Sequence, residues 1–245
     1  MESNFCKITG QNLHYLEAGS GIPLILLPGA WVTSKSYEKA GEKLSEKCKV
    51  YIPDLYKGKS EFKENPKSVY DYCQELEEFL AKLKISNYYL IGVSGSGIIA
   101  SHFAEKTSNK PIKLILFSTT FNLSPFFKRR NLMILKGLTK MILIRNFVPG
   151  GLVTNISTGF DAMSYFIKHP VQFLKEAFMQ IKNEEMEISV PTTLFVAKKD
   201  EFFPYKSLIK ANETVKNLKV ISLNKRHSWF YVEEEEFAEK ILSNL

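Results

Sequence analysis

Apolar residues occur along the chain in short runs that have the length of single β-strands. Six such runs cover residues 23–27, 50–52, 88–93, 112–118, 192–197 and 218–223. They are largely apolar rather than alternating, which is typical of strands that are covered on both faces of a sheet. Two shorter segments, 5–9 and 12–17, flank a Gly-Gln pair and predict an N-terminal hairpin.

Helical patterns separate most of these runs. They cover residues 36–46, 68–83, 95–106, 204–215 and 233–242. In the second pattern, apolar residues recur at three- and four-residue steps from Val69 to Leu83, which gives the helix one apolar face. Residues 233–236 are all glutamate and begin the last helix, where carboxylates favour the positive end of the dipole. The alternation of strand and helix predicts an α/β fold with a mainly parallel sheet.

The alternation breaks only between Ser118 and Pro191. A long, mostly helical segment with several proline and glycine breakers separates two strands there. We therefore predict a core formed by residues 1–118 and 191–245, with residues 119–190 inserted as a helical cap, or lid, after the sixth strand. A chain of 245 residues is long enough for one such domain with a large core.

Composition narrows the class of protein. A hydrophobic content of 44% and an aromatic content of 13% are those of a globular protein. The net charge of +7 is spread among acidic residues, with no basic stripe with interleaved aromatics, so we expect no nucleic-acid partner. The sequence shows neither a signal-peptide pattern nor an apolar run of about 18 residues. Three unrelated cysteines, Cys6, Cys48 and Cys73, favour reduced thiols and a cytoplasmic location.

One serine stands among small residues where an apolar run passes into a helical pattern. Residues 90–97 read LIGVSGSG, with Ser94 at the centre. A nucleophile elbow requires such a sequence, because the serine lies on a sharp strand-to-helix turn where larger neighbours would clash. A Gly-x-Ser sequence arises by chance about once in a chain of this length, so its placement carries the argument.

Several other stretches agree with this placement, and together they resemble the α/β-hydrolase superfamily over essentially the whole chain outside the insertion. Residues 26–29 resemble the family's His-Gly turn, residues 53–60 its Asp-x-x-Gly-x-Gly-x-Ser loop, residues 192–204 the strand that delivers the acid, and residues 227–230 its histidine loop. The family's chain order of serine, acid and histidine is met by Ser94, Asp200 and His227.

The resemblance implies a role for each of these residues. Ser94 would be the nucleophile, and His227 the general base that later acts as general acid. Asp200 would orient the imidazole and stabilise its charged form. Backbone N–H groups would form the oxyanion hole, and the resemblance points to Gly95 and Ala30, with Trp31 as the alternative to Ala30.

Three positions depart from the family pattern. Pro28 stands where the family usually has histidine, and Ser96 replaces the second glycine of Gly-x-Ser-x-Gly. Neither change removes a catalytic group, since Pro28 has no catalytic role to fill and Ser96 is still small. The loop after Asp54 has lost one glycine position, which affects the expected geometry at the entrance to the site.

Other residues compete for the roles of base and acid. The remaining histidines are weaker candidates by position: His14 lies in the hairpin, His102 two helical turns past the serine, and His169 in the insertion. Glu201 is the direct competitor of Asp200, and Asp54 is a distant one. Asp200 is favoured by its position just after an apolar strand. Residues 117–121 contain no carboxylate, so the acid position that some family members use after the preceding strand is not supported.

The insertion contains a basic stretch. Residues 126–148 include six lysines and arginines among many apolar residues and no acid. Such a stretch can lie on an anionic membrane surface or attract an acidic substrate. We favour a lid helix with its apolar face over the active site. The expected acyl pocket would include Trp31, Phe121, Phe126, Phe127, Met133 and Leu138.

The sequence thus predicts a serine hydrolase that cleaves an ester, thioester or related acyl substrate without metal or cofactor, with carboxylesterase as the favoured activity. A serine at the elbow argues against dehalogenases and epoxide hydrolases, which resemble this fold but use aspartate there. Two alternatives stay open: a C–C hydrolase or lyase with the same triad, and a non-catalytic member that binds a small ligand or a partner. Fold resemblance fixes neither the substrate nor the oligomeric state.

Overall fold

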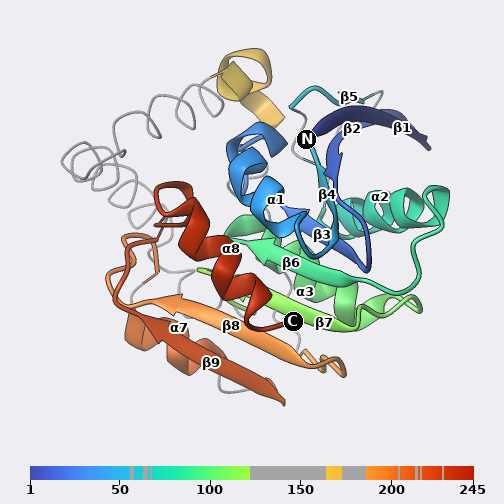
Figure 1. Cartoon of the computed structure of the whole chain (residues 1–245). Helices are drawn as coiled ribbons and strands as arrows, with labels where there is room; N and C mark the ends of the chain where they lie inside the picture. Colours follow the sequence, from blue (N-terminus) through green and yellow to red (C-terminus); the bar gives the residue numbers. More distant parts are fainter. Residues whose placement is uncertain are drawn as a thin grey trace.

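The computed structural model describes residues 1–55, 58–62, 66, 68–121, 164–172, 186–203, 205–212, 215, 217–227 and 229–245. In chain order its strands are β1 (Glu2–Ile8), β2 (Gln11–Ala18), β3 (Pro23–Leu27), β4 (Lys49–Pro53), β5 (Glu61–Phe62), β6 (Tyr89–Val93), β7 (Lys113–Phe117), β8 (Thr192–Ala197) and β9 (Leu218–Leu223). The helices are α1 (Glu38–Leu44), α2 (Val69–Lys82), α3 (Gly95–Lys106), α7 (Tyr205–Asn212) and α8 (Glu234–Leu242), with short 3₁₀ turns η1 (Ser34–Tyr37) and η3 (Trp229–Tyr231) (Figure 1).

The described strands form one sheet in the order β1-β2-β4-β3-β6-β7-β8-β9, with β5 paired to β2. β1 and β2 form the predicted antiparallel hairpin, and β2 is also antiparallel to β4. From β4 to β9 every neighbouring pair on this path is parallel, which confirms the mainly parallel sheet. The carboxyl ends of β3, β6, β7 and β8 therefore share one edge, where open α/β sheets place their sites.

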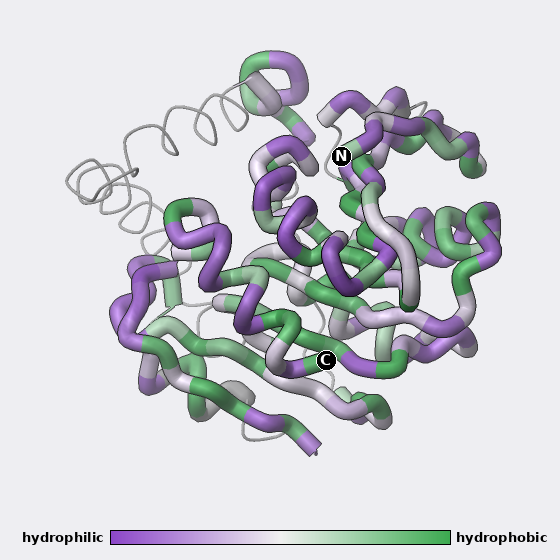
Figure 2. Tube along the Cα trace, viewed as in Figure 1, coloured by the Kyte–Doolittle hydropathy of each residue, from purple (hydrophilic) through white to green (hydrophobic). Residues whose placement is uncertain are grey.

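Helices cover both faces of the sheet (Figure 1). α1 packs against α8 on one face, and α2 packs against α3 on the other. Each layer has its own buried cluster: Leu44 of α1 and Ile241 of α8 belong to one, and Leu76 of α2 and Phe103 of α3 to the other. Figure 2 shows that the strands between these layers are mainly apolar. Burial on both faces explains why these strands read as continuous apolar runs.

The last strand differs from its expectation. All six positions of β8 are buried, whereas the six positions of β9 are partly buried or exposed. Val220 of β9 keeps 39% of its surface exposed. β9 is the last of the described strands in the sheet and none of its positions is buried, so the expectation that both of its faces are covered was wrong.

Most of the expected cap lies outside the described residues, namely 122–163 and 173–185. The expected cap begins after β7 and not after a sixth strand, because the structure contains the two-residue strand β5, which the sequence did not predict. In the described part, Tyr165 and Gln172 are buried, and Gln172 Nε2 donates to the carbonyl of Pro66 at 2.8 Å. The division into core and cap stays a prediction. Among the described helices, none is long and apolar enough to cross a membrane.

Candidate active site

Ser94 lies between the last residue of β6 and the first residue of α3. Its backbone has φ 51° and ψ −122°, a combination that few non-glycine residues adopt. The turn is held because Ser94 N donates to Phe117 O at the end of β7, at 2.8 Å, and Gly97 N donates to Ser94 O at 3.0 Å. Backbone strain of this kind concentrates at functional sites, where the surrounding structure maintains it.

Two glycines allow α3 to approach β6 closely. A Cβ on Gly92 would lie 2.7 Å from the Cα of Gly97 and 2.7 Å from the Cβ of Ala100. A Cβ on Gly97 would lie 2.5 Å from the Cγ2 of Thr119. Close-packed interiors do not accommodate such approaches without a shift of backbone, so the small residues around the serine are required by packing.

Ser96, which departs from the family pattern, is fully buried. Its Oγ donates to Leu27 O at 2.7 Å and accepts from Val93 N at 3.0 Å. The hydroxyl therefore links the elbow to the carboxyl end of β3. A glycine at this position would supply neither hydrogen bond, so the departure leaves the turn intact and adds a contact to it.

The structure brings Ser94, His227 and Asp200 together at the carboxyl edge of the sheet. Ser94 Oγ lies 2.9 Å from His227 Nε2, and His227 Nδ1 lies 2.8 Å from Asp200 Oδ2. The Asp200 side chain is 0% exposed and that of His227 is 6% exposed. An ionised carboxylate only accepts hydrogen bonds, so Nδ1 carries the proton and the lone pair of Nε2 faces the serine hydroxyl.

The second oxygen of the Asp200 carboxylate is also fixed. Asp200 Oδ1 accepts from Phe202 N at 2.8 Å and from Phe203 N at 2.7 Å. The rings of these two phenylalanines lie 4.7 and 5.7 Å from the ring of His227, measured between centroids. Sequence reasoning gave this aromatic pair no role, although it directly follows Asp200-Glu201 in the chain. Its rings therefore pack beside the imidazole that Asp200 holds.

Two further side chains contact His227, and neither was predicted to do so. Glu201, considered only as an alternative acid, accepts a hydrogen bond from the backbone N–H of His227. Ser118 donates through its Oγ to the backbone carbonyl of His227. The only sequence feature that could have indicated the contact of Glu201 with His227 is its position next to Asp200. No motif marks Ser118.

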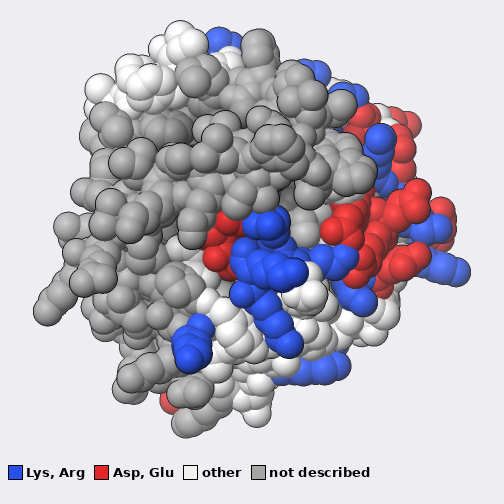
Figure 3. All heavy atoms as spheres, turned by 90° about the vertical axis from the view of Figure 1, so that its left-hand side faces the viewer, with Lys and Arg blue, Asp and Glu red and all other residues white. Residues whose placement is uncertain are grey.

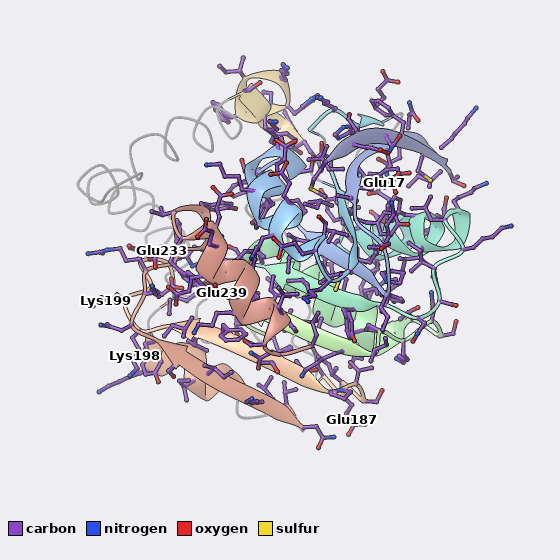
Figure 4. All side chains as sticks on the ribbon, viewed as in Figure 1. Glu17, Glu187, Lys198, Lys199, Glu233 and Glu239 are labelled. Carbon is purple, nitrogen blue, oxygen red and sulfur yellow. The ribbon has the colours of Figure 1, made fainter. Side chains whose placement is uncertain are left out.

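Charged side chains surround the histidine loop. Lys198 and Lys199 follow β8, are exposed, and point away from the sheet (Figure 4). Lys225 pairs with Glu233 and Glu236 at the start of α8. Figure 3 shows this side of the molecule, where lysine and arginine side chains lie next to aspartate and glutamate side chains. The described rim of the site therefore carries charges of both signs.

The turn after β3 lies beside the Ser94 elbow because β3 pairs with β6, with Leu27 opposite Gly92. The backbone N–H of Gly29 in this turn donates to the hydroxyl of Tyr37 at 3.0 Å. The Tyr37 hydroxyl in turn donates to that of Tyr231 in η3 at 2.8 Å. Burial raises the pKa of Tyr37 well above its usual value, so this hydroxyl keeps its proton. The chain of contacts ties the turn to the segment after the histidine.

The predicted oxyanion donors lie in two suitable backbone settings. The turn that contains Ala30 is closed by Val32 N donating to Gly29 O at 3.2 Å, and Trp31 within it has φ 62°. Gly95 is the first residue of α3. The N–H groups of the first helical turn have no partner within a helix, so they are oriented to bind an anion. The assignment of Ala30 and Gly95 as donors stays a prediction.

Of the predicted pocket residues, the structure describes two. Phe121 is buried in the cluster under α2 and α3, and Trp31 packs against the same cluster while partly exposed. The others, Phe126, Phe127, Met133 and Leu138, lie outside the described residues. Within the described part of the chain, no group of three His, Cys, Asp or Glu side chains is arranged to hold a metal ion.

The competing histidines have other partners. His14 Nδ1 lies 2.7 Å from Asp54 Oδ2, and its Nε2 lies 2.9 Å from Ser3 Oγ. Both nitrogens of this ring are thus engaged away from Ser94, and Asp54 is engaged with them. The remaining two histidines contact tyrosine rings: His102 that of Tyr70 and His169 that of Tyr165.

Asp54 also organises the loop in which one glycine position is missing. Its Oδ1 accepts from Ser34 N at 2.6 Å, and its Oδ2 accepts from Lys59 N at 3.3 Å. Gly58 has φ 45°, and a Cβ there would overlap the Asp54 carboxylate. Ser60 Oγ donates to Asp54 O at 3.0 Å. The aspartate, glycine and serine of the family's loop therefore remain in contact despite the shortening.

Comparison with known proteins agrees with the fold described above. Residues 22–186, more than half of the chain, match the model of a family described as the alpha/beta hydrolase fold. The chain belongs to this family. The match includes the Ser94 elbow and ends before β8, so Asp200 and His227 lie beyond it. None of the curated proteins matches this α/β-hydrolase in sequence.

Solved structures resemble the α/β-hydrolase along nearly its whole length. A serine hydrolase involved in carbazole degradation has a TM-score of 0.80 at 20% identity, covering 99% of this chain and 97% of its own. The enol-lactonase of Burkholderia xenovorans has a TM-score of 0.77 at 16% identity, covering 98% of both chains. The naproxen esterase of Bacillus subtilis has a TM-score of 0.69 at 18% identity, covering 99% and 90%. At these identities the likeness shows the fold alone.

Proposed function

We propose that this protein is a serine hydrolase that cleaves a small carboxylic ester or related acyl substrate through an acyl-enzyme intermediate. The observation that carries the proposal is the continuous hydrogen-bonded path from Ser94 Oγ through the His227 ring to Asp200, with contacts of 2.9 and 2.8 Å. A serine hydroxyl is a weak nucleophile until a neighbouring base takes its proton, and the His227 ring is oriented to do so.

In the first half of the reaction, Ser94 Oγ attacks the carbonyl carbon of the substrate while His227 Nε2 takes the hydroxyl proton. The imidazolium that forms lies against Asp200, whose buried carboxylate stabilises the positive charge. The backbone N–H groups of Ala30 and Gly95 stabilise the negative charge that develops on the carbonyl oxygen. His227 then gives the proton to the leaving alcohol, and Ser94 carries the acyl group.

In the second half, water replaces the alcohol. His227 Nε2 removes a proton from the water, whose oxygen attacks the acyl carbon, and the same nitrogen returns the proton to Ser94 as the acid product leaves. No group other than the triad, the two donors and water is needed. The reaction therefore proceeds without a cofactor.

The substrate class follows from what this machinery handles best. Esters have a carbonyl carbon open to attack and an alkoxide leaving group that a single proton neutralises, so a carboxylesterase is the activity we favour. The structural neighbours support an acyl substrate, since they include an enol-lactonase and an esterase. We further propose that the protein acts in the cytoplasm on a small molecule, with the basic stretch 126–148 serving a lid rather than a membrane contact.

Rapid-mixing kinetics with short-chain p-nitrophenyl esters test the proposal. We expect a burst of nitrophenol of about one equivalent per protein followed by slower turnover, because activated nitrophenyl esters acylate the serine faster than water hydrolyses the acyl-enzyme. The Ser94→Ala variant should show neither. If no ester or acyl-CoA thioester is turned over, and if wild type and Ser94→Ala bind the esters equally well, the protein is a non-catalytic binding member of the fold.

A further inference from the structure

We infer that Glu201 and Ser118 are positioning residues that clamp the peptide backbone of His227 in its reactive place, an inference that rests on the proposed function. The triad contacts fix only the ring of His227. The two additional contacts fix its main chain, one on the amide nitrogen and one on the carbonyl oxygen. His227 is thereby held at four separate atoms.

Glu201 holds the amino side of the residue. Its Oε2 accepts from His227 N at 2.8 Å, and its Oε1 lies 3.2 Å from the guanidinium of Arg226. The Glu201 side chain is only 5% exposed, so the carboxylate is directed inward at the loop rather than into solvent. Because Glu201 follows Asp200 directly, two adjacent carboxylates on one turn hold the ring and the backbone of the same histidine. Hydrogen bonds to a charged acceptor are the stronger kind.

Ser118 holds the carbonyl side. Its Oγ donates to His227 O at 3.0 Å, and the residue is 1% exposed. Ser118 itself is fixed, because it directly follows β7, its N–H donates to Phe195 O at 2.9 Å, and its φ is 48°. A non-glycine residue in this left-handed conformation is strained unless its surroundings maintain it. We infer that the strained conformation of Ser118 serves to hold the carbonyl group of His227.

The clamp matters because the histidine is delivered by a loop, whereas its partners follow strands of the rigid sheet. Ser94, Ser118 and Glu201 lie just after β6, β7 and β8, which are neighbours in the sheet. Reactive groups must meet at near-contact distance, and a misplacement of about 1 Å can cost about 100-fold in rate. With both peptide groups of His227 fixed to the sheet edge, Nε2 cannot drift from the Ser94 hydroxyl.

The chain provides two matched controls. Glu236 forms an ion pair at 2.7 Å with Lys225, which precedes His227 by two residues, and the described contacts of Glu236 do not include His227. Thr192, like Ser118, is a buried residue whose hydroxyl donates to a backbone carbonyl, that of Val190 at 2.9 Å, but at the opposite end of β8. Removing these groups shows whether the loss of an ion pair near the site, or of any buried hydroxyl, is enough to lower kcat.

The experiment compares Glu201→Ala, Glu201→Gln and Ser118→Ala with the controls Glu236→Ala and Thr192→Val. We expect kcat for a p-nitrophenyl ester to fall by about 10- to 100-fold in the two alanine variants, with KM nearly unchanged, because the ester itself does not contact the clamp. Glu201→Gln keeps an oxygen that accepts from His227 N and should recover most of kcat. The controls should keep wild-type kcat.

A second readout separates positioning from mere stability. The proton on His227 Nδ1, in its hydrogen bond to Asp200, should give a low-field proton NMR resonance that broadens or is lost in the alanine variants and persists in the controls. Thermal unfolding monitors folding, and Ser118→Ala, which removes one hydroxyl and keeps Cβ, carries the test if Glu201→Ala does not fold.

Four outcomes distinguish the inference from the proposed function. Folded alanine variants with wild-type kcat and an unchanged resonance would overturn it, as would an equal loss of kcat in the controls. A wild-type protein that hydrolyses no ester and does not react with a fluorophosphonate at Ser94 would instead overturn the proposed function. An active wild type with the expected pattern of losses supports both.

Discussion

Two histidines of this chain, His14 and His227, each lie between a serine and an aspartate. The two sites differ in the backbone conformation of the serine. His14 lies between Ser3 and Asp54 with contacts of 2.9 and 2.7 Å, much as His227 lies in the triad. Ser3, however, belongs to the regular extended strand β1. Ser94 occupies a strained turn at the N-terminus of α3, the position at which a helix presents backbone N–H groups to an anion. Side-chain contacts alone therefore do not make a catalytic site.

This contrast predicts different effects for equivalent substitutions. His227→Ala should lower kcat for an activated ester by about 10⁴-fold or more, since His227 is the base that contacts Ser94 in the part of the chain that the structure describes. His14→Ala should keep kcat within about tenfold while it destabilises the fold by about 1–3 kcal/mol, because it removes a buried partner of Asp54. Ester kinetics and urea unfolding of both variants measure these effects. Full activity of His227→Ala would show that another base is used.

The elbow between β6 and α3 is the element on which the site depends most. The sequence predicted its bounds well, since the helical pattern 95–106 coincides with α3 and small residues flank the serine. It did not predict that the hydroxyl of Ser96 bridges to Leu27 at the end of β3. Strand order decides that contact, and local residue patterns do not encode strand order.

We expect Ser96→Ala to lower the free energy of unfolding by about 1–3 kcal/mol, because loss of the Ser96 hydroxyl leaves Val93 N and Leu27 O without that buried partner. Ser101→Ala is the matched control. Its hydroxyl donates to Gly97 O four residues earlier in α3, at 2.6 Å, a contact that contributes little to helix stability. Urea unfolding of the two variants should give the larger loss for Ser96→Ala. Equal losses of unfolding free energy in the two variants would show that the bridge from Ser96 to Leu27 does not stabilise the fold.

Across the whole molecule, the order of strands and helices along the chain was predictable because it is read from local patterns. The candidate triad was identified through the family resemblance, and the structure brings its three residues together. The exposure of β9 was not predictable, since an apolar run does not tell whether its strand lies inside the sheet or at its end. The contact of Ser118 with His227 was not predictable either. It joins residues 109 positions apart, which only the assembled sheet brings together.

The three cysteines give a prediction for the whole fold. All are free thiols, and burial raises the pKa of Cys6, of Cys48 and of Cys73, the last to about 12. A raised pKa lowers the fraction of reactive thiolate at any pH below it. At pH 8 the native protein should therefore react slowly with iodoacetamide, whereas urea should make all three thiols react rapidly. Mass spectrometry counts the adducts, and fast modification of native protein would contradict the burial.

Labelling with a fluorophosphonate shows whether Ser94 is an activated nucleophile. The folded protein should gain one adduct, peptide mass spectrometry should place that adduct on Ser94, and unfolded protein or the Ser94→Ala variant should gain none. Absence of labelling in folded protein, or an adduct on another serine such as Ser3, would show that Ser94 is not the activated nucleophile.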